Sequence, residues 1–151
     1  MQHPTWQWRK FDELSLRQLH QILRLRQQVF VVEQNCAYED IDGWDDKATH
    51  LLAVAATDDL LGCCRVFAPG VRFAEANIGR ILVCSTNRGQ GLGHELVCRG
   101  KAFFAANFPS EPIKIAGQAH LQTFYGSHGF VTESDEYLVD DIPHVDMFYR
   151  P

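Results

Sequence analysis

The chain has 151 residues, of which 46% are hydrophobic and 22% charged, and its formal net charge is −5 at pH 7. These values are typical of one soluble globular domain, which we place over residues 1–151. A general nucleic-acid binder needs a concentrated basic face, so the acidic balance argues against a nucleic-acid partner and favours a cationic or small-molecule one.

Targeting signals and metal motifs are not apparent in the sequence. Residues 1–11 lack the apolar core of a secretion signal, and no stretch approaches the ~20 apolar residues of a membrane span. The five cysteines form no C-x-x-C pair and no zinc-like spacing with histidine. We therefore expect a cytoplasmic protein with reduced thiols, no membrane contact and no metal site. Cys63 and Cys64 are adjacent, so on a strand they should point to opposite faces.

The N-terminal third predicts a strand and a helix. Alternation over residues 5–11 predicts the strand, and residues 15–30 have the pattern of a helix. Ser15 and Gln18 have the spacing of a capping box. The expected apolar stripe of this helix consists of Leu16, Leu19, Ile22, Leu23, Val29 and Phe30.

The middle of the chain predicts an acidic loop followed by three strands. The loop covers residues 33–48, and residues 50–57 and 60–68 read as a hairpin that turns at Asp58 and Asp59. A further strand, residues 77–84, leads directly into a glycine-rich stretch.

The C-terminal half alternates again between helix and strand. A helix from Gly91 ends at Asn107 and Pro109. The remaining expected elements are a strand at 113–118, a short helix at 119–129, and strands around Tyr137 and at 145–149. This order indicates an α/β fold of the α+β type, with a mixed sheet and helices on its faces.

The stretch NRGQGLGHEL, residues 87–96, places bare backbone at a junction between strand and helix. Backbone N–H groups at such a junction can close on an anion, and the helix dipole supports the same charge. A Walker loop would need a Gly-Lys-Ser/Thr ending, and a dinucleotide fingerprint would need a third glycine where His94 stands. Neither pattern fits. A glycine-rich turn without a ligand is the alternative.

The spacing Arg88-x-x-Gly91-x-Gly93 resembles the pyrophosphate-binding loop of the GNAT superfamily of N-acetyltransferases. Four longer blocks are similar to the ElaA-like family within that superfamily, in the same order and spacing. These blocks are LRQQVFVVEQNCAYEDIDGWD, IGRILV, QAHLQTFYGSHGF and DDIPHVDM. Asp141 departs from the pattern, which has glycine there, so the conformation of that turn is left open.

The resemblance implies the GNAT fold with acetyl-CoA as the acyl donor. It implies a mixed sheet of six to seven strands, helices on both faces, and splayed central strands that hold the pantetheine arm. The implied contacts to pantetheine are Gln118 and the backbone of Ile81, Leu82 and Val83. The implied contacts to the pyrophosphate are the amides of Arg88, Gly89, Gln90, Gly91, Leu92 and Gly93. Ile81 and Val83 could equally serve as sheet core.

Tyr125 is the expected catalytic residue, because a phenol with a pKa near 10 can protonate a leaving thiolate. Aromatic packing is the alternative role for it. His120 is a candidate base or substrate contact. Glu33 and His144 are rivals as base and candidates for binding the substrate, and water could also relay the proton.

Two acidic segments, residues 33–46 and 133–146, carry six carboxylates each. On the acceptor side of a GNAT cleft they would attract a cationic amine, although a solvated acidic loop explains them equally well. The leading hypothesis is direct transfer of acetyl from acetyl-CoA to a primary amine of a small molecule or peptide. A CoA-binding sensor without turnover is the alternative, and a homodimer is left open.

Overall fold

The computed structural model describes residues 3–151 and contains an eight-stranded sheet in the order β1-β2-β3-β4-β5-β8-β6, with β7 paired to β8. The strands are β1 Thr5–Lys10, β2 Thr49–Val54, β3 Leu60–Phe67, β4 Ala76–Val83, β5 Ile113–Gln118, β6 Val131–Thr132, β7 Tyr137–Val139 and β8 Ile142–Tyr149. Within residues 3–151 only the β4–β5 pair is parallel. The expected mixed sheet is confirmed, with the two-residue β6 as the strand that its sequence did not predict.

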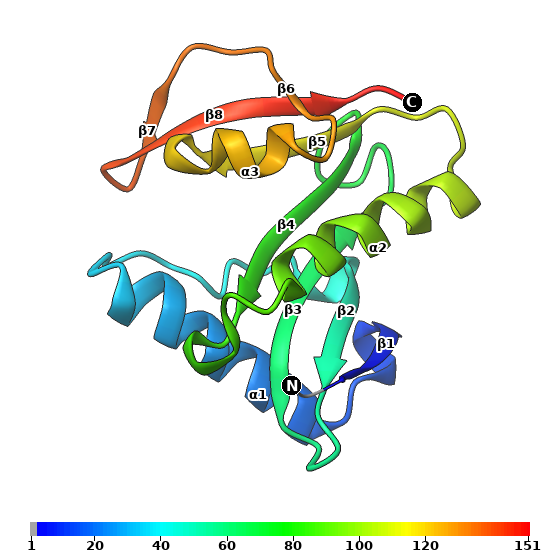
Figure 1. Cartoon of the computed structure of the whole chain (residues 1–151), viewed down its shortest axis with the longest axis vertical. Helices are drawn as coiled ribbons and strands as arrows, with labels where there is room; N and C mark the ends of the chain where they lie inside the picture. Colours follow the sequence, from blue (N-terminus) through cyan, green and yellow to red (C-terminus); the bar gives the residue numbers. More distant parts are fainter. Residues whose placement is uncertain (1–2) are drawn as a thin grey trace.

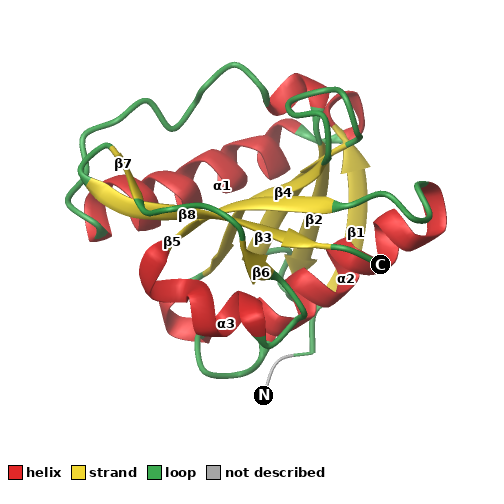
Figure 2. Cartoon of the chain, turned by 90° about the horizontal axis from the view of Figure 1, so that it is seen from above, coloured by secondary structure: helices red, strands yellow, loops and turns green. Residues whose placement is uncertain are grey.

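Helices cover both faces of this sheet, as expected (Figure 2). They are α1 Leu16–Arg26, which continues into η2 Gln27–Glu33, α2 Leu92–Asn107 and α3 Gln122–Gly126, with short turns η1 Phe11–Glu13, η3 Asp45–Lys47, η4 Ser85–Asn87 and η5 Ala119–Leu121. The apolar side chains of α1 pack against Cys63 and Leu82 on one face, whereas those of α2 pack with Cys64 on the other. The two adjacent cysteines therefore point to opposite faces, which confirms their prediction.

The first helix begins as its sequence predicts and ends differently. The Ser15 hydroxyl accepts the Gln18 amide at 3.0 Å, and the Gln18 side chain accepts the Ser15 amide at 3.1 Å. Leu16 was assigned to the apolar stripe but is 87% exposed, because it precedes the turn of the helix that reaches the sheet. Leu25 and Arg26, which were not assigned to the stripe, are buried.

Beyond residue 26 the helix widens into a π-helical turn that closes on the following loop. The Gln34 amide donates to the Val29 carbonyl at 3.3 Å, five residues back. Such turns are frequent at functional sites, and Phe30 and Glu33 of this one line a groove that is described below.

The central strands β4 and β5 separate shortly after they meet. Their register contains only Ala76 with Ile113 and Asn77 with Lys114, after which the strands diverge (Figure 1). On its other side β4 has a bulge against β3, where Arg80 takes a left-handed φ of 50°. The splay expected from the resemblance is confirmed.

Candidate functional site

The gap between the diverging strands opens into a groove of about 710 Å³, which we call the outer groove. Its walls are the end of β4, the loop that precedes α2, the π-helical turn η2, and the η5–α3 segment. Ligand pockets in proteins commonly have 300–1,000 Å³. Of the expected coenzyme contacts, the groove is lined by Ile81, Leu82, Val83, Arg88, Gly89, Gly91, Leu92, Gly93 and Gln118. Gln90, also expected there, is exposed and does not line it.

The glycine loop presents open backbone to the outer groove. Gly89 and Gly91 have φ angles of 77° and 83°, and Gly91 is the N-cap of α2. Apart from the residue itself and its two chain neighbours, no heavy atom lies within 4 Å of the place where a Cβ of either residue would stand. The first amides of a helix lack intrahelical acceptors. The loop therefore has the free donors and the space that a phosphate group requires.

Glu33 lies at the mouth of the outer groove, bound to Arg88. The two Arg88 terminal nitrogens donate to its carboxylate at 2.7 and 2.8 Å, and Arg88 Nε donates to the Val83 carbonyl at 3.2 Å. The hydrogen bond from Arg88 lowers the pKa of Glu33, which makes it a weaker base. Glu33 is therefore engaged at the glycine loop and is not among the residues that line the inner part of the cleft.

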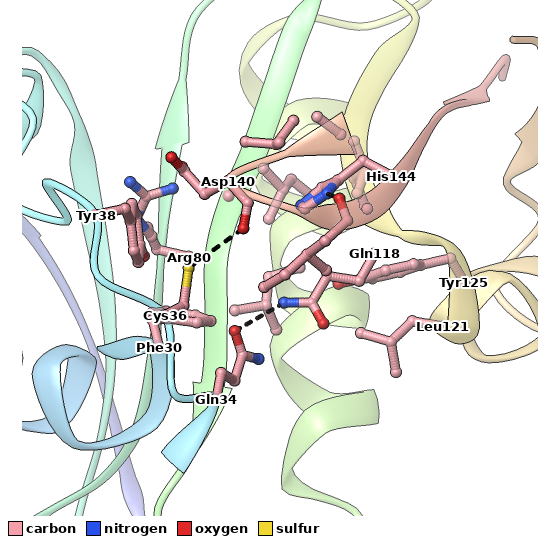
Figure 3. A pocket seen from close by; sticks show the side chains of 18 residues that line it. Phe30, Gln34, Cys36, Tyr38, Arg80, Gln118, Leu121, Tyr125, Asp140 and His144 are labelled. Carbon is pink, nitrogen blue, oxygen red and sulfur yellow. Dashed lines mark hydrogen bonds between the residues drawn. The ribbon is translucent and has the colours of Figure 1, made fainter. Parts of the chain in front are cut away.

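The groove continues inward as a smaller cavity of about 130 Å³, which we call the inner cavity (Figure 3). Phe30, Gln34, Gln118, Leu121 and Tyr125 line both spaces. The Gln118 side-chain amide donates to the Gln34 side chain at 3.1 Å across the gap. Because the two spaces share these lining residues, together they form one cleft between β4 and β5.

Tyr125 stands at the junction of the outer groove and the inner cavity. Its ring is buried against Gly117, whose added Cβ would lie only 3.0 Å from a ring carbon. Burial, with a smaller contribution from Cys64, raises the pKa of Tyr125 to about 12. The phenol is therefore protonated at neutral pH and can act as a proton donor.

The two candidate histidines lie in different parts of the cleft. His120 is exposed and lines the outer groove, whereas His144 lines the inner cavity, opposite Gln118 in the β5–β8 register. His144 Nδ1 lies 2.7 Å from the Ile142 carbonyl. A carbonyl oxygen only accepts, so Nδ1 carries the proton and Nε2 of the neutral ring keeps a free lone pair.

Four of the six carboxylates in the first acidic segment are bound to arginines, which argues against the alternative in which this segment attracts a cationic amine as a free anionic surface. Asp40, Asp42 and Asp45 bind arginines of α1, β3 and β4 and of the β3–β4 connection: Arg26, Arg65, Arg72 and Arg80. In the second segment Glu133 pairs with Arg150 and Asp146 with Lys114. Among the residues that line the inner cavity, Asp140 is the one carboxylate.

Several cavity residues had no signal of their own in the sequence. Gln34, Cys36, Tyr38, Arg80 and Asp140 line the inner cavity from η2, the loop after it, β4 and the β7–β8 turn. The Cys36 thiol donates to the Asp140 carbonyl at 3.6 Å, which joins two of these segments. Residues 25–45 supplied part of the family resemblance, but their pattern does not tell which side chains turn inward.

The turn that precedes His144 takes the conformation usually given to glycine. Asp140 and Asp141 have φ angles of 48° and 65°. Aspartate adopts left-handed backbone more readily than most residues. The departure at Asp141 therefore leaves the hairpin of β7 and β8 intact.

Residues 3–151 contain neither a candidate membrane span nor a candidate metal site. No helix in this part of the chain is long and apolar enough to span a bilayer. In the same residues no three His, Cys, Asp or Glu side chains are grouped to hold a metal ion.

Comparisons with known proteins agree with this geometry. The sequence model of the acetyltransferase (GNAT) domain matches residues 16–150. The ElaA protein of Escherichia coli is 38% identical over 144 residues, which cover 94% of this chain and 94% of ElaA. A UPF0039 protein of Synechocystis is 36% identical over 146 residues, covering 97% of this chain and 95% of the relative.

Solved structures give the same answer for the fold. An acyl-CoA N-acyltransferase from Pseudomonas aeruginosa is similar with a TM-score of 0.91 and 38% identity, over 97% of this chain and 99% of the other. The crystal structure of Escherichia coli ElaA gives a TM-score of 0.90 and 36% identity, over 97% and 99%. With these matches running along nearly its whole length, the chain belongs to the GNAT acetyltransferase family, in its ElaA-like branch, and is an acyltransferase by family.

Proposed function

We propose that the protein transfers acetyl from acetyl-CoA directly to a primary amine of a small-molecule or peptide acceptor in the cytoplasm. The observation that carries this proposal is the cleft between β4 and β5, with its outer groove and inner cavity. Its outer groove ends in the open amides of the glycine loop, and its inner cavity places Tyr125 and His144 on neighbouring walls. A cleft with a separate place for each of two substrates suits direct transfer.

The outer groove has the features that coenzyme A requires. The amides of Gly89, Gly91, Leu92 and Gly93 would hold the pyrophosphate, and the unpaired edge of β4 at residues 81–83 would bind pantetheine as a strand binds its neighbour. Acetyl-CoA, when bound, supplies the acyl group as an activated thioester.

The protein's own side chains would provide the proton transfers in the inner cavity. His144 Nε2, the ring nitrogen with a free lone pair, would accept a proton from the acceptor ammonium group, directly or through water. The Tyr125 hydroxyl would hold or deliver the proton needed by the leaving group. His120 lies on the coenzyme side, so we assign the base role to His144 in preference to it.

Attraction for a cationic acceptor would depend on Asp140. The neighbouring carboxylates Asp40 and Asp42 are already bound to arginines. We therefore propose that the protein recognises the amine itself through Asp140 and His144, and not through a broad acidic surface.

The first test is binding of coenzyme A to a matched pair of glycine variants. In Gly91→Val the left-handed backbone is strained and the loop amides lose their direction. We expect CoA affinity to fall at least about tenfold, which corresponds to the loss of one charge-assisted hydrogen bond. Gly70→Val is the control, because Gly70 has a φ of 81°, equally open surroundings and no part in the cleft.

Calorimetry on the folded variants decides between the outcomes. Unchanged affinity in Gly91→Val, or an equal loss in Gly70→Val, would contradict the proposed coenzyme site. Release of free thiol from acetyl-CoA with a panel of amines then separates an enzyme from a CoA-binding sensor, which would bind CoA but release none.

A further inference from the structure

A chain of three ionisable side chains runs from the outer groove to the surface of α2. His94 lines the groove, and its Nδ1 lies 2.8 Å from Nε2 of His128. His128 Nδ1 in turn lies 3.7 Å from the Cys98 sulfur. Phe124 packs against both imidazole rings, at centroid distances of 4.7 and 5.4 Å, and holds the pair beside the glycine loop.

The short distance between the two rings limits where protons can reside. One of the two facing nitrogens must donate and the other accept, so both rings cannot be fully protonated together. With Nδ1 of His94 engaged by His128, Nε2 is the ring nitrogen left for a ligand in the groove.

Two proton arrangements give His94 an Nε2–H donor. In the first both rings are neutral, with Cys98 donating to His128 and His128 donating to His94. In the second His94 is an imidazolium, its Nδ1–H donates to His128, and His128 donates onward to the Cys98 sulfur. Both arrangements agree with the two observed contacts, His94 with His128 and His128 with Cys98.

An anion in the groove favours the second arrangement. Hydrogen bonds between charged partners are about twice as strong as neutral ones. We propose that His94 is a phosphate-binding residue of the coenzyme groove and takes up a proton when coenzyme A binds, with His128 accepting its Nδ1–H. This inference rests on the proposed coenzyme site and adds a residue that the glycine motif does not include.

The charged groups around His94 and His128 allow one proton to be added to this pair of histidines. Burial, followed by the neighbouring His94 and Lys101, lowers the pKa of His128, which therefore stays neutral and able to accept. Lys101 is bound to the His128 carbonyl, Glu95 to Arg99 and Glu33 to Arg88. His120, from η5, shares the groove. Both carboxylates among these groups are bound to arginines, so neither is free to pair with His94 in place of a ligand.

The test is calorimetric titration of CoA between about pH 6 and 8, the range in which histidine titrates, in two buffers of different ionisation enthalpy. Wild type should take up a proton on binding, seen as a buffer-dependent heat. His94→Gln should lose that buffer-dependent heat. Its affinity for CoA should be about tenfold lower than that of wild type near pH 6, and the reduction should be much smaller near pH 8. Because CoA's own phosphates titrate equally in both proteins, the difference isolates His94.

Two further variants complete the design. His20→Gln, a histidine of α1 outside the cleft, should behave as wild type. His128→Leu removes the acceptor of the His94 Nδ1–H and should reduce the proton uptake. Nitrogen-15 spectra of the imidazole rings should show His94 becoming an imidazolium on binding.

The possible failures are distinguishable. Wild type that binds CoA without proton uptake, or His94→Gln with the wild-type pH profile, would overturn this inference and leave the coenzyme site standing. Absence of CoA binding to wild type would instead overturn the proposed function.

Discussion

Tyr125 combines a ring in the core with a hydroxyl at the meeting point of the two parts of the cleft. The ring packs between Phe124 and Phe130 and over Gly117. Because these contacts involve ring carbons, replacing the residue by phenylalanine should preserve them. The substitution therefore tests the hydroxyl alone.

We predict that Tyr125→Phe lowers kcat by about 10²–10⁴, the usual scale for general acid–base catalysis. The dissociation constant for CoA should change less than about tenfold, since the hydroxyl would act mainly in the transition state. Tyr149→Phe, on β8 outside both spaces, is the control for losing a phenol. Full activity in Tyr125→Phe would reassign the residue to packing.

Asp140 offers a second single-residue test, directed at the acceptor. Asparagine has nearly the same shape and also tolerates the left-handed backbone, so Asp140→Asn removes only the charge. We predict that the KM of the amine rises about fivefold, the effect of ~1 kcal/mol for one partly solvated charge. The KM of acetyl-CoA should stay unchanged.

The neighbouring Asp141 provides the matched control for this change. It occupies the same turn with a φ of 65° and does not line the inner cavity. Steady-state kinetics in which Asp141→Asn raises the amine KM as much as Asp140→Asn would show that the turn, and not the carboxylate, matters.

At the scale of elements, the loop after η2 is fixed by ion pairs that lie below the surface. Arg26 and Arg65 are 1% and 3% exposed, and both donate to Asp45 Oδ1, at 2.6 and 2.8 Å. Arg80, at the β4 bulge, donates to Asp40 at 2.9 Å. The loop therefore depends on charge pairing more than on apolar contacts, and it carries Cys36 and Tyr38 into the inner cavity.

Acid should loosen this loop. Burial by itself would raise the pKa of Asp42 and Asp45, but the hydrogen bonds and charges of Arg65 and Arg26 outweigh it and lower both from 3.8. Groups with lowered folded pKa values stabilise the protein above their unfolded pKa, and this stability is lost as the pH falls below it. We predict that the contribution of these carboxylates to stability is constant above about pH 5 and declines below about pH 4.

Asp45→Asn should cost about 2–3 kcal/mol of unfolding free energy at neutral pH, because Arg26 and Arg65 each lose one of their carboxylate partners while keeping Asp40 and Asp42. The adjacent, exposed Asp46 provides the control as Asp46→Asn. Chemical denaturation across the pH range measures both. If Asp45→Asn left the free energy of unfolding unchanged, or if its stability depended on pH as that of wild type does, the ion pairs would not be what supports the loop.

The sequence allowed most elements to be predicted, because their signals are local. Ser15 capped its helix as expected, and the strand–glycine–helix junction at Gly91 lies where its residues placed it. The residues that face into the cleft could be predicted less well. The Arg80 bulge and the pair of His94 with His128 depend on segments far apart in the chain, and a single sequence contains no period or spacing that reports such contacts.

At the scale of the whole molecule, the sheet consists of two parts joined at a narrow place. Strands β1 to β4 form one part and β5 to β8 the other, and the register between them contains only two residue pairs. The Gln34–Gln118 hydrogen bond crosses the gap further along. A ligand lying between the parts would supply contacts that the protein lacks, and its binding should stiffen both.

We predict that CoA slows hydrogen exchange on both sides of the gap, at residues 78–83 of β4 and at the end of β5, as well as in the glycine loop. ADP carries a pyrophosphate but no pantetheine arm, so it should protect only residues 88–94. The outer pair β1–β2, remote from the cleft, serves as an internal control in the same spectra. Ligand binding protects amides by raising the free energy of local opening, so the pattern reports where each portion of the ligand lies. Equal protection of β4 and β5 by ADP and by CoA would mean that pantetheine does not occupy the splay, and the inner cavity could not then be the place where the acyl group meets its acceptor.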